Sequence, residues 1–133
     1  INAELSVFTK KKTQLTLDEI VDFYGSLAYY TPTKPTPKKA LNPLFTIEKT
    51  TQEPLLQCIL QLRRLVTIHE GLRLQDVKRY GITIYRRDFD ANDKFVTVTD
   101  SMPAGDPRRA IQLPQDVISA GLTPNPRKTL TAK

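Results

Sequence analysis

The stretch VKRYGITIYRRDF, residues 77–89, places four basic and three aromatic side chains within thirteen residues. Cations that pair with phosphates and aromatic rings that stack on bases are the components of a sequence-tolerant nucleic-acid surface. A two-stranded ribbon with a basic face can also enter a groove of duplex DNA. The candidate binding residues are Lys78, Arg79, Tyr80, Tyr85, Arg86 and Arg87.

The alternation of side chains along a strand predicts how this stretch is oriented. Ile82 and Ile84 are expected to face the core, whereas Tyr85 and Arg87 are expected to face outward. Arg86 falls on the isoleucine side, at the end of the strand. The competing interpretation is an ordinary solvated outer face, in which the arginines pair with neighbouring aspartates.

The net charge of +6 is concentrated in two segments of the 133-residue chain. Residues 60–87 carry seven Lys or Arg against Glu70 and Asp76, and residues 117–133 carry three basic residues and no acid. Residues 88–116 are net acidic. A localised basic field attracts anionic partners, so the sequence predicts binding of an anionic partner, most plausibly nucleic acid.

Chemistry that needs a catalytic centre finds little support. The chain has one cysteine and one histidine, Cys58 and His69, which would lie about 16 Å apart along a continuous helix. They therefore do not form a nucleophile pair, and a zinc site of the usual Cys/His type lacks ligands. No glycine-rich phosphate loop is present. We expect a non-enzymatic protein with no cofactor and no bound metal.

Residues 88–99 show a partial likeness to a calcium-binding loop. Asp88, Asp90 and Asn92 occupy its first, third and fifth positions. The sixth position, which requires glycine, is Asp93, and the twelfth, which requires glutamate, is Thr99. A hairpin turn accounts for the same residues, because Asp and Asn side chains cap turns.

Two segments have helical patterning. Residues 16–28 begin with Thr16 and have Glu19 three positions later, the spacing of a capping box. Residues 53–68 begin with a Glu-Pro pair that suits a helix start. In the second helix a stripe at helical spacing is expected to be buried: Leu55, Ile59, Leu62 and Val66.

The remaining patterned segments predict strands. The clearest is a β-hairpin of residues 81–89 and 94–99, because both segments are rich in β-branched and aromatic residues and turn formers separate them. Weaker strand patterns lie at residues 3–9, 44–50, 72–77 and 110–113, and a short helix is expected within 114–121. The fold class predicted is α+β, with two main helices packed on a small, mostly antiparallel sheet.

Residues 30–43 contain four prolines and three lysines, which favour an extended arm over a helix or a central strand. We expect the arm to pack on another part of the protein or on a neighbouring molecule, although a spacer or a surface loop would have the same composition. Residues 1–122 then form one domain with this arm, and residues 123–133 form a flexible basic tail.

The sequence gives a broad indication of partners and location. The arm and the basic tail suggest a second hypothesis, a structural or assembly module of a viral or multi-subunit particle that self-associates through extended arms. No stretch is long and apolar enough to span a bilayer, so no membrane association is expected. The single cysteine is compatible with a reducing, intracellular compartment, although the localisation stays open.

Overall fold

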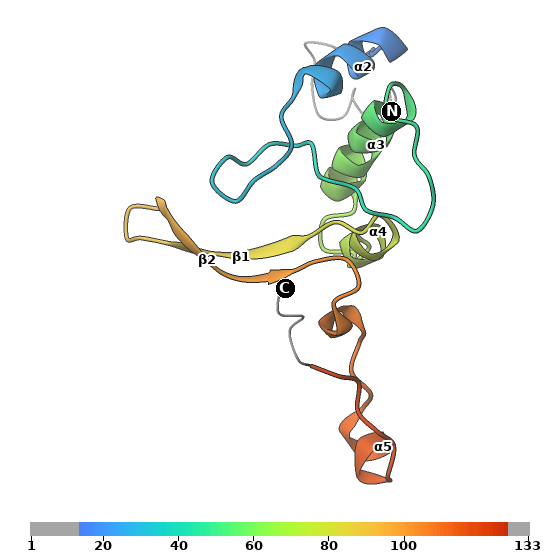
Figure 1. Ribbon diagram of the computed structural model, residues 1–133, viewed down its shortest axis with the longest axis vertical. Helices are drawn as coiled ribbons and strands as arrows, with labels where there is room; N and C mark the ends of the chain where they lie inside the picture. Colours follow the sequence, from blue (N-terminus) through green and yellow to red (C-terminus); the bar gives the residue numbers. More distant parts are fainter. Residues whose placement is uncertain (1–13, 128–133) are drawn as a thin grey trace.

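The computed structural model describes residues 14–127 and has the expected α+β fold class, with helices α2 and α3 in contact and a two-stranded antiparallel hairpin (Figure 1). In chain order the elements are α2 (Leu17–Ser26), α3 (Gln52–Val66), α4 (Arg73–Arg79), β1 (Ile84–Phe89), β2 (Phe95–Met102), the short 3-10 helix η1 (Pro107–Arg109) and α5 (Gln115–Ser119). The helices α2, α3 and α4 form the body, the hairpin projects from one side, and α5 lies at the far end (Figure 1).

The starts of α2 and α3 are set by side chains that satisfy free backbone N–H groups. In α2 the Thr16 hydroxyl accepts from the Glu19 N–H, and the Glu19 carboxylate accepts from the Thr16 N–H, which completes the predicted capping box. In α3 the Glu48 carboxylate accepts from the N–H groups of Thr51 and Gln52. A hydrogen bond from the Thr50 hydroxyl, together with these backbone bonds, lowers the pKa of Glu48 to about 2.

The core consists of two small apolar clusters on different sides of α3. The first joins α2 to α3 through Ile20, Tyr24 and Cys58. The second joins α3 to α4 and to the start of the hairpin and contains Leu60, Val77 and Ile82, with Leu41 and Tyr80 packed against them. Because α3 contacts elements on two sides, it is the central element of the fold.

The predicted buried stripe of α3 is only partly correct. Leu55 and Leu62 are half-buried against the first cluster, but Ile59 and Val66 are 39% and 42% exposed. The face of α3 that is most completely buried instead carries Gln57, which is 1% exposed. Helical periodicity of apolar residues could not predict that the most buried face of α3 carries a polar residue. The Gln57 side chain is buried there because it is hydrogen-bonded to the backbone of Lys39.

Lys39, near the end of the arm, lies against this polar face of α3. The Lys39 N–H donates to Oε1 of Gln57 at 2.9 Å, and Nε2 of Gln57 donates to the Lys39 carbonyl at 2.6 Å. One buried side chain therefore satisfies both backbone groups of one arm residue, as a neighbouring β-strand would. The arm packs on its own chain, against α3.

A second attachment holds the end of the arm. The Asn42 N–H donates to the carbonyl of Tyr80 at 2.8 Å. Gly81 follows with a positive φ of 58°, and a Cβ atom there would lie 2.0 Å from the carbonyl oxygen of Asn42. Only glycine allows both this backbone conformation and this close approach. Residues 39–42 are thus held between α3 and the turn that follows α4.

Several predicted strands are absent. Residues 44–50 form turns and irregular chain, and residues 72–77 lie largely within α4, which buries Asp76 and Val77 and leaves Leu72 and Leu74 exposed. Residues 110–113 form no strand. The predicted strand at 3–9 lies outside the described residues. Within residues 14–127 the sheet therefore has two strands.

The predicted hairpin is present, with two irregularities in its register. Ile84 pairs with Met102 and Phe89 pairs with Phe95, and shifts occur between Arg86 and Arg87 and between Asp88 and Phe89. Such bulges increase the local twist and redirect side chains. The Asp90 carboxylate accepts from the N–H groups of Asn92 and Lys94, so the aspartate-rich residues form the turn.

Arg109 ties the hairpin to α4. It is 8% exposed, and its guanidinium donates to the carbonyls of Val77, Ile82 and Met102. The Val77 carbonyl belongs to α4, Ile82 lies two residues before β1, and Met102 ends β2. The hairpin is consequently fixed at its base, whereas its tip projects freely.

The Gln57 contact gives a direct test of the arm. Replacing Gln57 with Leu leaves a buried N–H and a buried carbonyl of Lys39 without partners, so we expect a loss of about 2–5 kcal/mol in the free energy of unfolding. Urea denaturation measures the loss. The control is Gln52→Leu, since Gln52 makes only an exposed bond to the Glu48 N–H and should lose less than about 1 kcal/mol. Equal losses in the two variants would show that the arm is not held by Gln57.

Candidate anion-binding pocket

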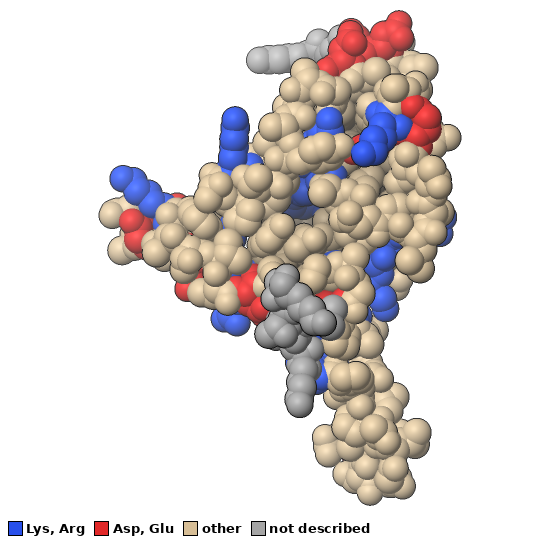
Figure 2. Space-filling view, viewed as in Figure 1, with Lys and Arg blue, Asp and Glu red and all other residues tan. Residues whose placement is uncertain are grey.

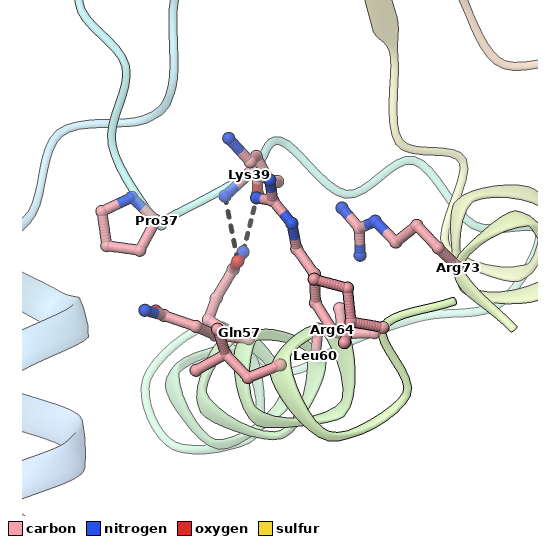
Figure 3. Close-up of a pocket in the computed structure, with 9 residues that line it drawn as sticks. Pro37, Lys39, Gln57, Leu60, Arg64 and Arg73 are labelled. Atoms are coloured by element: carbon pink, nitrogen blue, oxygen red, sulfur yellow. Dashed lines mark hydrogen bonds between the residues drawn. The ribbon is translucent and has the colours of Figure 1, made fainter. Parts of the chain in front are cut away.

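Four cations converge where the arm crosses the body: Lys39 from the arm, Arg64 from α3, Arg73 from α4 and Arg87 from β1. They line three adjoining hollows of about 330, 350 and 310 Å³, and Lys39 and Arg64 line all three. Figure 3 shows the side chains of Arg64 and Arg73 directed toward Lys39. We call this set of four residues the cationic pocket.

The backbone places each member of the pocket. The Gln57 contact fixes Lys39 beside α3, where Arg64 lies in the last turn. Arg73 begins α4, which packs against α3. Arg87 lies on the half-buried face of β1. The cations therefore come from four segments that are distant in sequence, and the fold brings them together.

Within residues 14–127 no carboxylate forms an ion pair with a member of the cationic pocket, and Asp76 acts on Arg73 only through its nearby charge. The ion pairs of the described chain are Arg63 with Asp76, and Arg108 with both Asp100 and Asp106. None of them involves a member of the cationic pocket. Figure 2 shows basic side chains deep in the middle of this face and acidic ones mainly at its edges.

The electrostatic effect is largest at Lys39. Partial burial, together with the nearby positive charges of Arg64, Arg73 and Arg87, lowers its pKa from 10.5 to about 8. The Lys39 ammonium retains one bond, from Nζ to the Thr36 carbonyl at 3.0 Å. Burial and the charge of Arg64 likewise lower the pKa of Arg73, against the smaller opposing effect of Asp76. An anion in the pocket would relieve this repulsion.

Two tyrosines form one wall of the pocket. The rings of Tyr30 and Tyr85 stack with centroids 6.0 Å apart, and Nζ of Lys39 lies 3.3 Å from the centroid of Tyr30. Arg87 also approaches the Tyr30 ring, at 5.9 Å. Tyr30 therefore already contacts Tyr85 and Lys39. The two rings stabilise the neighbouring cations and leave no open surface on Tyr30 for a base to stack on.

The structure separates the six residues proposed from the sequence into three places. Tyr85 and Arg87 face the cationic pocket. Arg86 is exposed on the other side of β1, as are Ile84 and Asp88. The predicted orientation of the strand is therefore reversed: Ile82 is buried, but Ile84 faces solvent and the Tyr85–Arg87 side faces the body. The reason is that the arm covers this side of the hairpin.

Lys78, Arg79 and Tyr80 lie elsewhere, at the end of α4. The Arg79 guanidinium is 5.6 Å from the ring centroid of Phe45, which in turn contacts Tyr80 edge to face. Lys78, Arg79 and Phe45 border a separate hollow of about 450 Å³ next to Arg109. The predicted basic face of the hairpin is therefore not one continuous surface.

Sequence reasoning missed Lys39, Arg64 and Arg73. Arg64 and Arg73 belong to the basic segment 60–87, but no local pattern relates them to a lysine in the arm. The one usable signal was Gln57, a polar residue within the most apolar helix, which indicates that this face of the helix meets another part of the chain.

Other kinds of site find no geometric support in the described part of the chain. No group of three or more His, Cys, Asp and Glu side chains among residues 14–127 is arranged to hold a metal ion. Cys58 is buried in the first apolar cluster, where burial raises the pKa of its thiol. The described helices include none with the length and apolar character needed to cross a membrane.

Comparison with known proteins does not assign the chain to a family. No protein-family model matches the chain, and no curated protein or solved structure is significantly similar to it. The function is therefore inferred from the chain's own residues: the uncompensated cations, the two small apolar clusters and the apolar side chains that remain exposed.

The charge of Lys39 predicts a measurable pH dependence. Because the folded-state pKa is lowered, the unfolded chain binds more protons between about pH 8 and 10.5, so this group makes stability increase as the pH rises through that range. Cys58 acts in the opposite direction above about pH 9, so the comparison is with Lys39→Met. Urea denaturation at pH 7.5 to 9.5 should show the wild type gaining stability relative to this variant. A difference in the free energy of unfolding between wild type and variant that does not change with pH would contradict the proposed repulsion.

Proposed function

We propose that the protein is an assembly module that associates with a second copy of itself through the exposed side chains of α2 and α3. The observation that carries this proposal is the small extent of the core. Among residues 14–127 six hydrophobic residues are buried, whereas sixteen large hydrophobic side chains are exposed. Isolated apolar side chains are normal on a surface, but adjoining ones favour an interface.

The exposed side chains include a connected group on the two helices. Phe23 of α2 and Leu65 of α3, 53% and 49% exposed, line one apolar groove of about 370 Å³. Ile68, just beyond α3, is 65% exposed. Leu65 and Ile68 also line the cationic pocket beside Arg64, so the apolar groove and the positive charge are contiguous.

The complementary surface is present on α2. Its exposed Leu17 and Phe23 are flanked by the exposed acids Asp18 and Asp22. A second copy can place this apolar and acidic helix against the apolar and basic end of α3. Two-fold symmetry makes this contact twice, which is the usual geometry of homodimers. Buried apolar area would drive the association, and the charges would select the orientation.

The proposal is tested by measuring molar mass against concentration. Light scattering should show the mass rising from 15.1 kDa toward that of a dimer between about 5 and 200 µM. Phe23→Asp combined with Leu65→Asp should remain monomeric. Val96→Asp is the control, because Val96 is equally exposed but lies on the hairpin. A wild type that stays at 15.1 kDa throughout would refute the proposal.

Nucleic-acid binding is the second candidate, and the cationic pocket is the observation that favours it. Four cations without carboxylates, in a chain of net charge +6, match the backbone contacts of a polyanion. Base stacking is not supported, since Tyr30 already contacts Tyr85 and Lys39. The candidate is therefore sequence-independent binding of phosphates.

A salt titration of oligonucleotide binding tests this candidate. If all four cations engage phosphates on a duplex, the slope of log affinity against log salt should be about −3 to −4. Arg87→Gln should flatten the slope by about 1, whereas Arg86→Gln should leave it unchanged because Arg86 faces away. Equal effects would favour the whole basic strand over the pocket, and no binding at about 50 mM salt would exclude the candidate.

A further inference from the structure

We propose that Lys39 is a site of covalent imine formation with small anionic aldehydes. The three arginines of the cationic pocket bind the phosphate or carboxylate group of the aldehyde. This inference goes beyond both functions above and depends on neither of them. It rests on the geometry of the pocket: one amine and three guanidinium groups line three adjoining hollows, and no carboxylate side chain lines any of them.

The chemistry needs a neutral amine. The lone pair of Lys39 Nζ attacks the carbonyl carbon, the carbonyl oxygen takes up a proton, and the carbinolamine then loses water to give the imine. No oxidant or reductant is consumed. An ordinary lysine with a pKa of 10.5 is almost entirely protonated at neutral pH, so it reacts slowly.

The surroundings of Lys39 favour the neutral amine. Its pKa of about 8 gives roughly 200-fold more free amine at pH 7.4 than a pKa of 10.5 does. The charged groups that face it are Arg64 on α3, Arg73 on α4 and Arg87 on β1, and all three have the same sign. Desolvated lysines next to other cations are the standard nucleophiles of Schiff-base chemistry.

The same arginines provide selectivity for an anion. Guanidinium groups bind phosphate and carboxylate through paired N–H donors. Three of them beside one amine would raise the local concentration of an aldehyde that carries such a group. A neutral aldehyde of the same shape would gain nothing from them. The pocket should therefore distinguish a phosphorylated aldehyde from its unphosphorylated analogue.

Pyridoxal phosphate and pyridoxal are a matched pair of probes. The full chain is incubated with each at pH 7.4, reduced with borohydride to trap the imine, and mapped by peptide mass spectrometry. With pyridoxal phosphate, Lys39 should be labelled at least about tenfold more than Lys34, which is exposed on the same arm. With pyridoxal the preference for Lys39 should fall several-fold.

Two further measurements assign the effect to the arginines. Arg87→Gln should reduce labelling of Lys39 by pyridoxal phosphate, and its neighbour Arg86→Gln should not, because Arg86 faces away from the pocket. Inorganic phosphate added to the wild type should compete at Lys39 and leave Lys34 unchanged, which provides a test even if a variant fails to fold. Labelling of Lys39 no stronger than that of Lys34 would overturn the proposal. Equal labelling by the two probes would overturn the role of the arginines.

Discussion

The contact between the Gln57 side chain and the backbone of Lys39 is the constraint on which the arrangement of this chain depends. The proline-rich arm forms only a few backbone hydrogen bonds of its own, such as that from the Tyr30 N–H to the Lys38 carbonyl, and its other buried backbone groups need partners elsewhere. Gln57 satisfies both groups of Lys39 from within α3. This fixes the register of the arm, places Lys39 beside Arg64, and positions the preceding Tyr30 over the hairpin. Without the contact, neither the pocket nor the buried face of β1 would be defined.

The arm also accounts for the exposed apolar side chains and the clustered positive charge of the molecule. A polar contact occupies the face of α3 that would otherwise bury apolar side chains, so the apolar residues on the rest of the helix, such as Ile59 and Leu65, remain exposed. The same arrangement gathers four positive charges, none of which forms an ion pair with an acid of the described chain. Both features are costly for an isolated chain, because apolar area stays hydrated and like charges repel. We therefore favour functions in which an external group covers the apolar surface, or neutralises the charge, or does both.

Much of the fold could be predicted from local sequence, and the candidate site could not. The capping box at Thr16, the Glu-Pro start of α3 and the turn at Asp90 are local signals, and each lies in the element it predicted. The strand predicted at residues 72–77 is wrong, because the alternating Leu72 and Leu74 stay exposed and the segment forms α4, whose buried residues are Asp76 and Val77. The cationic pocket depends on which face of α3 meets the arm. The contact between Gln57 and Lys39 determines which face meets the arm. This contact joins segments that are distant in sequence, so the periodicity within either segment cannot predict it.

Native-state hydrogen exchange at the Lys39 amide tests the central claim most directly. This N–H donates to a side chain that is almost completely buried, so its exchange should require opening of the packing between the arm and α3. The Lys34 amide, which donates within an exposed turn of the same arm, is the internal reference. The account predicts that Lys39 exchanges at least about a hundredfold more slowly than Lys34, after correction for intrinsic rates. Equally fast exchange at the two amides would show that the arm is not held on α3 and that the pocket does not persist.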